Sequence, residues 1–132
     1  MGTQENKTLV ANAFAAWAHT GDVRAFFELV DDRVLWTVLG TCPVSGTYKG
    51  KTAFVESAAK PVFERLAAPL QPNLRSLICE HDWLVLQWFG EAPTKDGSSY
   101  KNEFCWVMRI ENSKIVECIA YFDTQAAAAL LR

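Results

Sequence analysis

The sequence predicts an α+β fold in which a curved antiparallel sheet wraps around packed N-terminal helices. Two observations predict it. Apolar residues in the first half recur at helical spacing, whereas beyond Pro69 and Pro72 the pattern changes to that of strands. Helices followed by a run of antiparallel strands are typical of this fold class. The 132 residues suit a single domain over residues 1–132, with no linker, repeat or low-complexity tract dividing it.

Three helices are expected in the first half. The first ends at Gly21, where the helical pattern stops. Its apolar stripe consists of Leu9, Val10, Ala13, Phe14 and Trp17. A short second helix is expected over residues 23–30. The third covers residues 51–66, and Pro61 should kink or split it near Lys60 because proline lacks a backbone donor.

Strands dominate the second half, although one strand is expected earlier, over residues 34–39. Residues 41–50 hold Pro43, Gly46 and Gly50 and predict a loop. The later strands are expected at residues 73–79, at residues 83–91 and in the two arms of a hairpin between Tyr100 and Asp123, before a last helix at residues 124–131.

The final hairpin carries the strongest functional signal. It turns at Asn112-Ser113, and we expect Ile110 to pair with Ile115 across the turn. The ladder then places Met108 opposite Glu117, Trp106 opposite Ile119, Phe104 opposite Tyr121 and Asn102 opposite Asp123, all on one face. An apolar wall with a few converging polar groups predicts a small-molecule pocket. A slip of one residue would move the side chains of one strand to the opposite face.

Composition excludes several classes of function. The net charge is −2 without a basic run, so nothing indicates a nucleic-acid partner. No apolar stretch reaches membrane-spanning length and the N-terminus lacks the order of a signal peptide, which predicts a cytoplasmic protein without a membrane partner. The cysteines, at positions 42, 79, 105 and 118, have no paired spacing and indicate buried thiols rather than disulfides or metal ligands. No cofactor is implied.

The order of these segments resembles the SnoaL-like branch of the nuclear-transport-factor-2-like superfamily. The matching segments are LWTVLG from Leu35, SGTYKGKTAF from Ser45, YKNEFCWVMRI from Tyr100 and KIVECIAYFDT from Lys114, so the resemblance covers essentially the whole chain. It implies a cone-shaped α+β fold with one internal pocket and, as in most members, a homodimer. The family includes polyketide cyclases, ketosteroid-isomerase-like enzymes and members without a known activity, so the fold does not fix the function.

The resemblance places Asp123 where the polyketide cyclases keep a general-base aspartate. Against the apolar wall this carboxylate would be desolvated, which would raise its pKa and make it a better base. Asp123 could instead cap the following helix, as could Thr124. Asn102 is either a pocket donor or an edge residue satisfied by the backbone. Tyr121 completes the candidate catalytic set because its hydroxyl could donate to a ligand.

The expected ligand is a small apolar ring compound. The remaining candidate ligand-binding residues are Trp36, Phe104, Trp106, Ile119, Phe14, Trp17 and Tyr48. Three functions stay open. In the first, Asp123 takes a proton from carbon beside a carbonyl, in isomerase- or cyclase-type chemistry, while Asn102 or Tyr121 donates to the developing oxyanion. In the second, the pocket holds a ligand without turnover. In the third, the outer face of the sheet joins two copies or holds a partner.

Overall fold

The computed structural model describes residues 2–132 and confirms the α+β fold. The helical elements are α1 (Thr3–Thr20), α2 (Arg24–Phe27), α3 (Lys51–Phe54), the π-helix η1 (Val55–Ala59), α4 (Lys60–Phe63) and α5 (Thr124–Leu130). The strands are β1 (Val30–Val38), β2 (Gly46–Lys49), β3 (Gln71–Glu80), β4 (Trp83–Pro93), β5 (Ser99–Glu111) and β6 (Lys114–Phe122). They form one six-stranded sheet in the order β2-β1-β6-β5-β4-β3.

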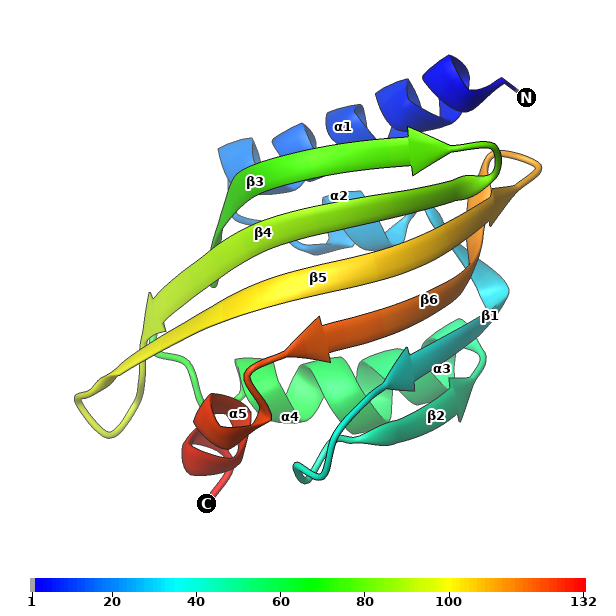
Figure 1. The fold of residues 1–132 in the computed structure, drawn as a ribbon. Coiled ribbons are helices and arrows are strands. Elements are labelled where there is room, and N and C mark those ends of the chain that lie inside the picture. The colour runs from blue at the N-terminus through cyan, green and yellow to red at the C-terminus, as the bar shows by residue number, and fades with distance from the viewer. Residues whose placement is uncertain (1) are drawn as a thin grey trace.

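The sheet is curved, and the helices that precede β3 cover one of its faces (Figure 1). In that view α1 runs behind β3, α2 lies behind the middle of the sheet, and α3 and α4 lie behind β6, β1 and β2. Helix α5 sits at the end of β6, close to the start of β5. The opposite face of the sheet carries no helix among the described residues.

The first three helices differ in detail from the prediction. Helix α1 ends as expected, with Gly21 in the left-handed conformation at φ 74°. The second is shorter because Val30 already begins β1. The third is not broken at Pro61. Its backbone widens into a π turn before the proline, where the Lys60 N–H bonds the carbonyl of Val55, and this wide turn accommodates the missing donor.

The sheet is antiparallel except at one pair. Strands β3 to β6 follow one another as a meander, but β1 runs parallel to β6. The expected loop at residues 41–50 is wrong in part, because residues 46–49 form β2 and pair with β1. Gly46 begins this short strand and Gly50 follows it, and because glycine is typical of turns, the sequence pattern indicated a loop.

The final hairpin turns where the sequence predicts. Asn112 and Ser113 both have positive φ, at 51° and 65°, as a two-residue hairpin turn of type I′ requires. Ile110 pairs with Ile115 as expected. Beyond this pair β6 has a bulge at Val116, so Arg109 pairs with Glu117 and Trp106 with Ala120.

Candidate ligand-binding cavity

A cavity of about 80 Å³ lies between the covered face of the sheet and the helices. Six aromatic side chains of the sheet line it: Trp36, Trp88, Tyr100, Phe104, Trp106 and Phe122. Trp17, Phe27, Phe54 and Phe63 close it from the helical side. Every other residue of the wall is aliphatic or aromatic, so Tyr100 supplies its only hydroxyl.

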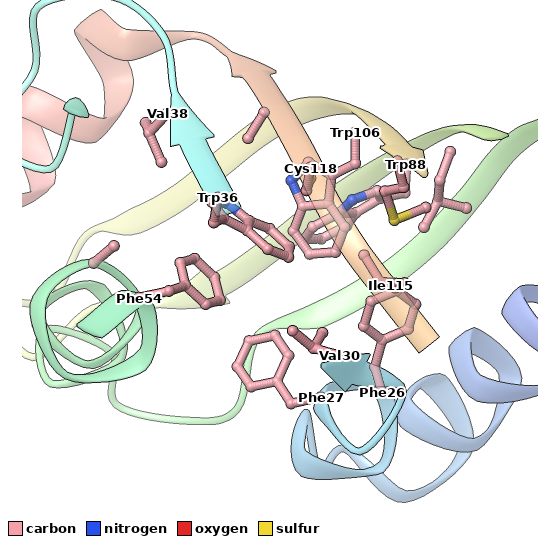
Figure 2. Packing of buried hydrophobic residues seen from close by; sticks show 14 of the residues in the cluster. Phe26, Phe27, Val30, Trp36, Val38, Phe54, Trp88, Trp106, Ile115 and Cys118 are labelled. Atoms are coloured by element: carbon pink, nitrogen blue, oxygen red, sulfur yellow. The ribbon is translucent and has the colours of Figure 1, made fainter. Parts of the chain in front are cut away.

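The aromatic rings of the wall hold one another in place. Trp36 stacks on Phe54 with ring centroids 4.0 Å apart, which joins β1 to α3. Trp88 stacks on Phe104 at the same distance, and Trp106 meets Trp88 edge to face at 5.1 Å. Figure 2 shows Phe27 and Phe54 pointing from the helices toward Trp36 and Trp106 on the sheet. Such contacts fix the shape of the wall, because each pair adds to the energy of burial.

Tyr100 lines the cavity, and behind it Asn102 and the backbone of Asp123, which do not line it, form a hydrogen-bonded group with the Tyr100 hydroxyl. The Oδ1 atom of Asn102 accepts the backbone N–H of Asp123 at 2.9 Å, which fixes the orientation of the amide. Its Nδ2 atom then donates to the Tyr100 hydroxyl at 2.9 Å and to the Asp123 carbonyl at 3.0 Å. Both amide protons are therefore in use. Asn102 is only 3% exposed. Of its two expected roles, pocket donor or residue satisfied by the backbone, the structure shows the second, and the same amide holds the Tyr100 hydroxyl in place.

Tyr100 lines the cavity and carries a neutral hydroxyl. The side chain is 5% exposed, and burial raises the pKa of Tyr100 to about 12 because it disfavours the phenolate. The hydrogen bond from Asn102 acts in the opposite direction, and the nearby Cys42 and Asp123 raise the pKa further. The phenol therefore stays protonated near neutral pH.

Asp123 is the N-cap of α5. Its exposed carboxylate accepts the backbone N–H groups of Gln125 at 3.0 Å and Ala126 at 3.2 Å. It is not among the residues that line the cavity. A general base at this position was expected to be desolvated. In this conformation the Asp123 carboxylate is instead exposed and hydrogen-bonded to the start of α5, outside the cavity wall. Its catalytic role stays a prediction.

The placement of Tyr121 and Ile119 on the inner face is wrong. The bulge at Val116 moves both side chains to the uncovered face of the sheet, where Tyr121 is 47% exposed. Phe122 and Ala120 line the cavity in their place. The same bulge turns Glu117 outward, where it meets the Arg109 guanidinium at 3.3 Å.

The other predicted ligand-binding residues divide into two groups. Trp17, Trp36, Phe104 and Trp106 line the cavity. Phe14 and Tyr48 do not. Phe14 packs behind the wall with its ring centroid 6.1 Å from that of Trp88, and Tyr48 donates its hydroxyl to the Val44 carbonyl at 2.7 Å.

Sequence reasoning missed Tyr100 and Trp88. A signal for Tyr100 was present, since it has the same strand parity as Asn102 and Phe104 and must share their face. Trp88 could have been found through the pairing of β4 with β5, which places it opposite Phe104.

Two surface grooves adjoin the cavity. One, of about 360 Å³, lies between the end of α1 and residues 66–70. The other lies between α2 and the η1–α4 segment. Val23 and Phe63 line both grooves and also the cavity, so these two side chains separate the interior from the surface.

Neither metal ligands nor membrane-spanning helices are found within residues 2–132. No group of three or more His, Cys, Asp or Glu side chains could hold an ion there. The four cysteines in this part of the chain are unpaired. None of its helices has both the length and the apolar character needed to cross a membrane.

A curved sheet closed by helices around an apolar interior is the arrangement of the nuclear-transport-factor-2-like proteins. Bal32a, from a soil-derived mobile gene cassette, has a TM-score of 0.81 at 20% identity, covering 98% of both chains. A nuclear-transport-factor-2-like protein of Burkholderia thailandensis has a TM-score of 0.78 at 20% identity, covering 96% of this chain and 97% of the other. TerC, crystallised with polyporic acid, has a TM-score of 0.75 at 21% identity and the same coverage.

The chain belongs to the SnoaL-like domain family, which matches residues 10–118. The resemblance predicted from the sequence is thereby confirmed. No curated protein matches the sequence significantly. Because these three structures are only 20–21% identical to the chain, they define the fold and leave the activity to be argued from the cavity.

Proposed function

We propose that the chain binds a small apolar ring compound in the cavity. The observation that carries this proposal is the composition of the wall, which is wholly aliphatic and aromatic apart from the Tyr100 hydroxyl. Concave apolar sites with few polar groups are typical of small-molecule binding. A charged ligand would lose its hydration there without gaining a partner, which disfavours nucleotides and sugar phosphates.

The aromatic character of the wall favours a ring. Trp36, Trp88 and Trp106 present flat indole surfaces, on which a planar or alicyclic ring can pack in stacked or edge-to-face contact. The co-crystallisation of TerC with polyporic acid supports a ring compound as a ligand for this chain, since the two proteins share the fold.

The volume of the cavity limits the ligand to a small one. Its 80 Å³ is less than the roughly 150 Å³ of an engineered apolar cavity that admits benzene. Binding therefore requires side chains to move. Val23 and Phe63 are suited to this, because displacing them would join the cavity to the neighbouring grooves.

Thermal denaturation tests the proposal. A ligand that binds only the native state raises the melting temperature as its concentration rises, and neutral ring compounds should do so. Ala58→Leu fills the cavity from η1 and should abolish the shift. Ala15→Leu makes the same change on the exposed side of α1 and should keep it. Stabilisation by nucleotides and sugar phosphates, without any by ring compounds, would refute binding of this kind.

Isomerase- or cyclase-type chemistry is an additional prediction that requires more than binding. Asp123 would have to leave the N-terminus of α5 and turn toward the cavity, giving up two hydrogen bonds. The hydrogen bonds between its backbone and Asn102, which also bonds the Tyr100 hydroxyl, support this prediction, because Tyr100 lines the cavity. Substitution of Asp123 by Ala and by Asn separates this role from capping.

We also propose that two copies associate through the uncovered face of the sheet. Leu35, Ile78, Trp83 and Tyr121 are exposed on it, at 37% to 59%. A two-fold dimer would remove this apolar surface from water. Sedimentation should give a dimer at micromolar concentration, Leu35→Glu should dissociate it, and Thr8→Glu on exposed α1 should not. A wild-type monomer would refute the proposal.

A further inference from the structure

Phe63 lies on the cavity side of its helix, although a regular α-helix would place it on the opposite side. Helices α3 and α4 are joined end to end by η1, and Phe54 and Phe63 both line the cavity. Phe63 lies nine residues after Phe54 in the sequence. At 3.6 residues per turn, nine residues make about two and a half turns, which would point the two side chains in opposite directions.

The π turn of η1 accounts for the position of Phe63. The Lys60 N–H bonds the Val55 carbonyl, five residues earlier, so this turn holds one residue more than an α turn. The extra residue takes back about 100° of rotation, the angle between successive residues of an α-helix, from everything that follows it. Phe63 therefore comes to within about 80° of Phe54, on the face that lines the cavity.

Pro61 holds the turn in this wide form. An α turn would direct the nitrogen of Pro61 at the Ser57 carbonyl, but proline has no N–H to donate and its ring clashes with that carbonyl. A proline inside an α-helix disfavours the helix about a hundredfold. The wide turn avoids this penalty, so Pro61 selects the register that brings Phe63 to the cavity.

The segment from η1 to α4 is held at both ends and only loosely in between. Before it, Phe54 stacks on Trp36 at 4.0 Å between ring centroids. After it, the Arg65 carbonyl accepts the Lys95 N–H at 3.0 Å. Of the four residues of α4, Lys60 is exposed and the other three are half-buried. An element with so little buried surface can change its register while the rest of the fold stays in place.

We propose that the π turn is the hinge of a gate, in which Phe63 closes the cavity while the turn is wide and leaves the wall when the turn tightens to an α turn. Phe63, with Val23, separates the cavity from both surface grooves, so its departure opens a path for a ligand. Pro61 keeps the gate closed most of the time and thereby limits the rate of entry. This inference rests on the proposed function and adds how access to the cavity is regulated.

Pro61→Ala tests the hinge. Without the proline the α turn is no longer penalised, so the Lys60 N–H should bond the Glu56 carbonyl in place of the Val55 carbonyl. A long-range HNCO spectrum, which detects scalar coupling across hydrogen bonds, identifies the acceptor in the wild type and in the variant. Retention of the Val55 carbonyl as the acceptor in Pro61→Ala would overturn the inference.

The rate at which benzene enters tests the gate, and NMR exchange spectroscopy measures that rate for each variant. We expect Pro61→Ala to raise the association rate about ten- to hundredfold, up to the full penalty of the proline. Phe63→Ala removes the gating side chain and should raise the rate without changing the acceptor of the Lys60 N–H. Pro43→Ala, in the exposed loop before β2, should change neither the rate nor the acceptor.

A second change should close the gate again. Deletion of the exposed Ser57 from Pro61→Ala gives an α-helix with Phe63 eight residues after Phe54, again about 80° from it, and the benzene rate should return to the wild-type rate. A rate that stays high after the deletion, or an unchanged rate in a Pro61→Ala variant whose acceptor has moved, would overturn the inference and leave the proposed function intact. Failure of benzene to bind the wild type and every variant would refute the proposed function, while the acceptor of the Lys60 N–H in Pro61→Ala would still decide whether the π turn is a hinge.

Discussion

Replacing Asp123 tests whether its carboxylate serves the fold or the chemistry. The side chain accepts two backbone N–H groups at the start of α5, at 3.0 and 3.2 Å, and is exposed to solvent. Asp123→Ala leaves both groups without a side-chain partner, which costs about 1 kcal/mol for a helix cap. In a chain of 132 residues this corresponds to a fall in melting temperature of about 3–5 °C. Asn caps as well as Asp, so Asp123→Asn should change stability by only a few tenths of a kcal/mol.

Loss of the Asp123 side chain should disturb only the start of α5. Helix α5 has 7 residues and buries Ala127, and Arg65 holds its far end through the Leu130 and Arg132 carbonyls at 3.1 Å. We therefore expect fraying of the first turn rather than unfolding of the helix.

The assay is thermal or urea denaturation of the wild type, Asp123→Ala and Asp123→Asn, with Asp32→Ala as a control. Asp32 is an exposed carboxylate on β1, and its loss should stay within about 0.5 kcal/mol. Unchanged stability of Asp123→Ala would refute the capping argument. If a turnover is found, a 10²–10⁴-fold loss in a normally stable Asp123→Asn variant would favour the general-base role.

Three further substitutions have defined outcomes. Ser113→Gly relieves a left-handed conformation at φ 65° and should raise stability by about 0.5–1 kcal/mol in urea denaturation, whereas Ser99→Gly on β5 should not. Hydrogen bonds, chiefly from the Thr94 hydroxyl, lower the pKa of Asp96 to about 2, so its contribution to stability is present above the unfolded pKa near 4 and is lost as the pH falls toward 2. Asp96→Asn should therefore flatten acid denaturation over that window, and an unchanged slope would contradict the argument. A Cβ at Gly90 would lie 2.8 Å from Cζ3 of Trp88, so Gly90→Ala should cost about 1–3 kcal/mol and change the tryptophan fluorescence, and an unaltered spectrum would argue against the close contact.

The sequence predicted the elements whose signals are local. Helical spacing around Phe14 and Trp17, and alternation in the final hairpin, depend on neighbouring residues alone. Strand β2 was not predictable in this way. Its four residues begin with Gly46 and are followed by Gly50, and it is a strand because it pairs with β1. Tertiary pairing decides such short segments.

The residues of the candidate site could be predicted only where the register of the final hairpin was known. Both sets of alternate residues in β6 are mostly apolar, so the hydrophobic pattern does not reveal which set faces inward or where a bulge lies. The bulge at Val116 exchanged Tyr121 for Phe122 on the cavity wall. On β5, which has no such ambiguity, Asn102, Phe104 and Trp106 were assigned to the correct face.

The parallel pairing of β1 with β6 implies an order of folding. Strands β3 to β6 are neighbours in sequence and can form from successive short-range hairpins, whereas β1 joins a strand more than 80 residues later in the chain. Closing so long a loop is slow, so we expect the β1–β2 hairpin to dock last. Pulse-labelled hydrogen exchange during refolding should protect the amides of β4 and β5 before those of Trp36 and Val38. Since Trp36 on β1 stacks on Phe54 at the cavity wall, the interior would then close only when β1 joins β6.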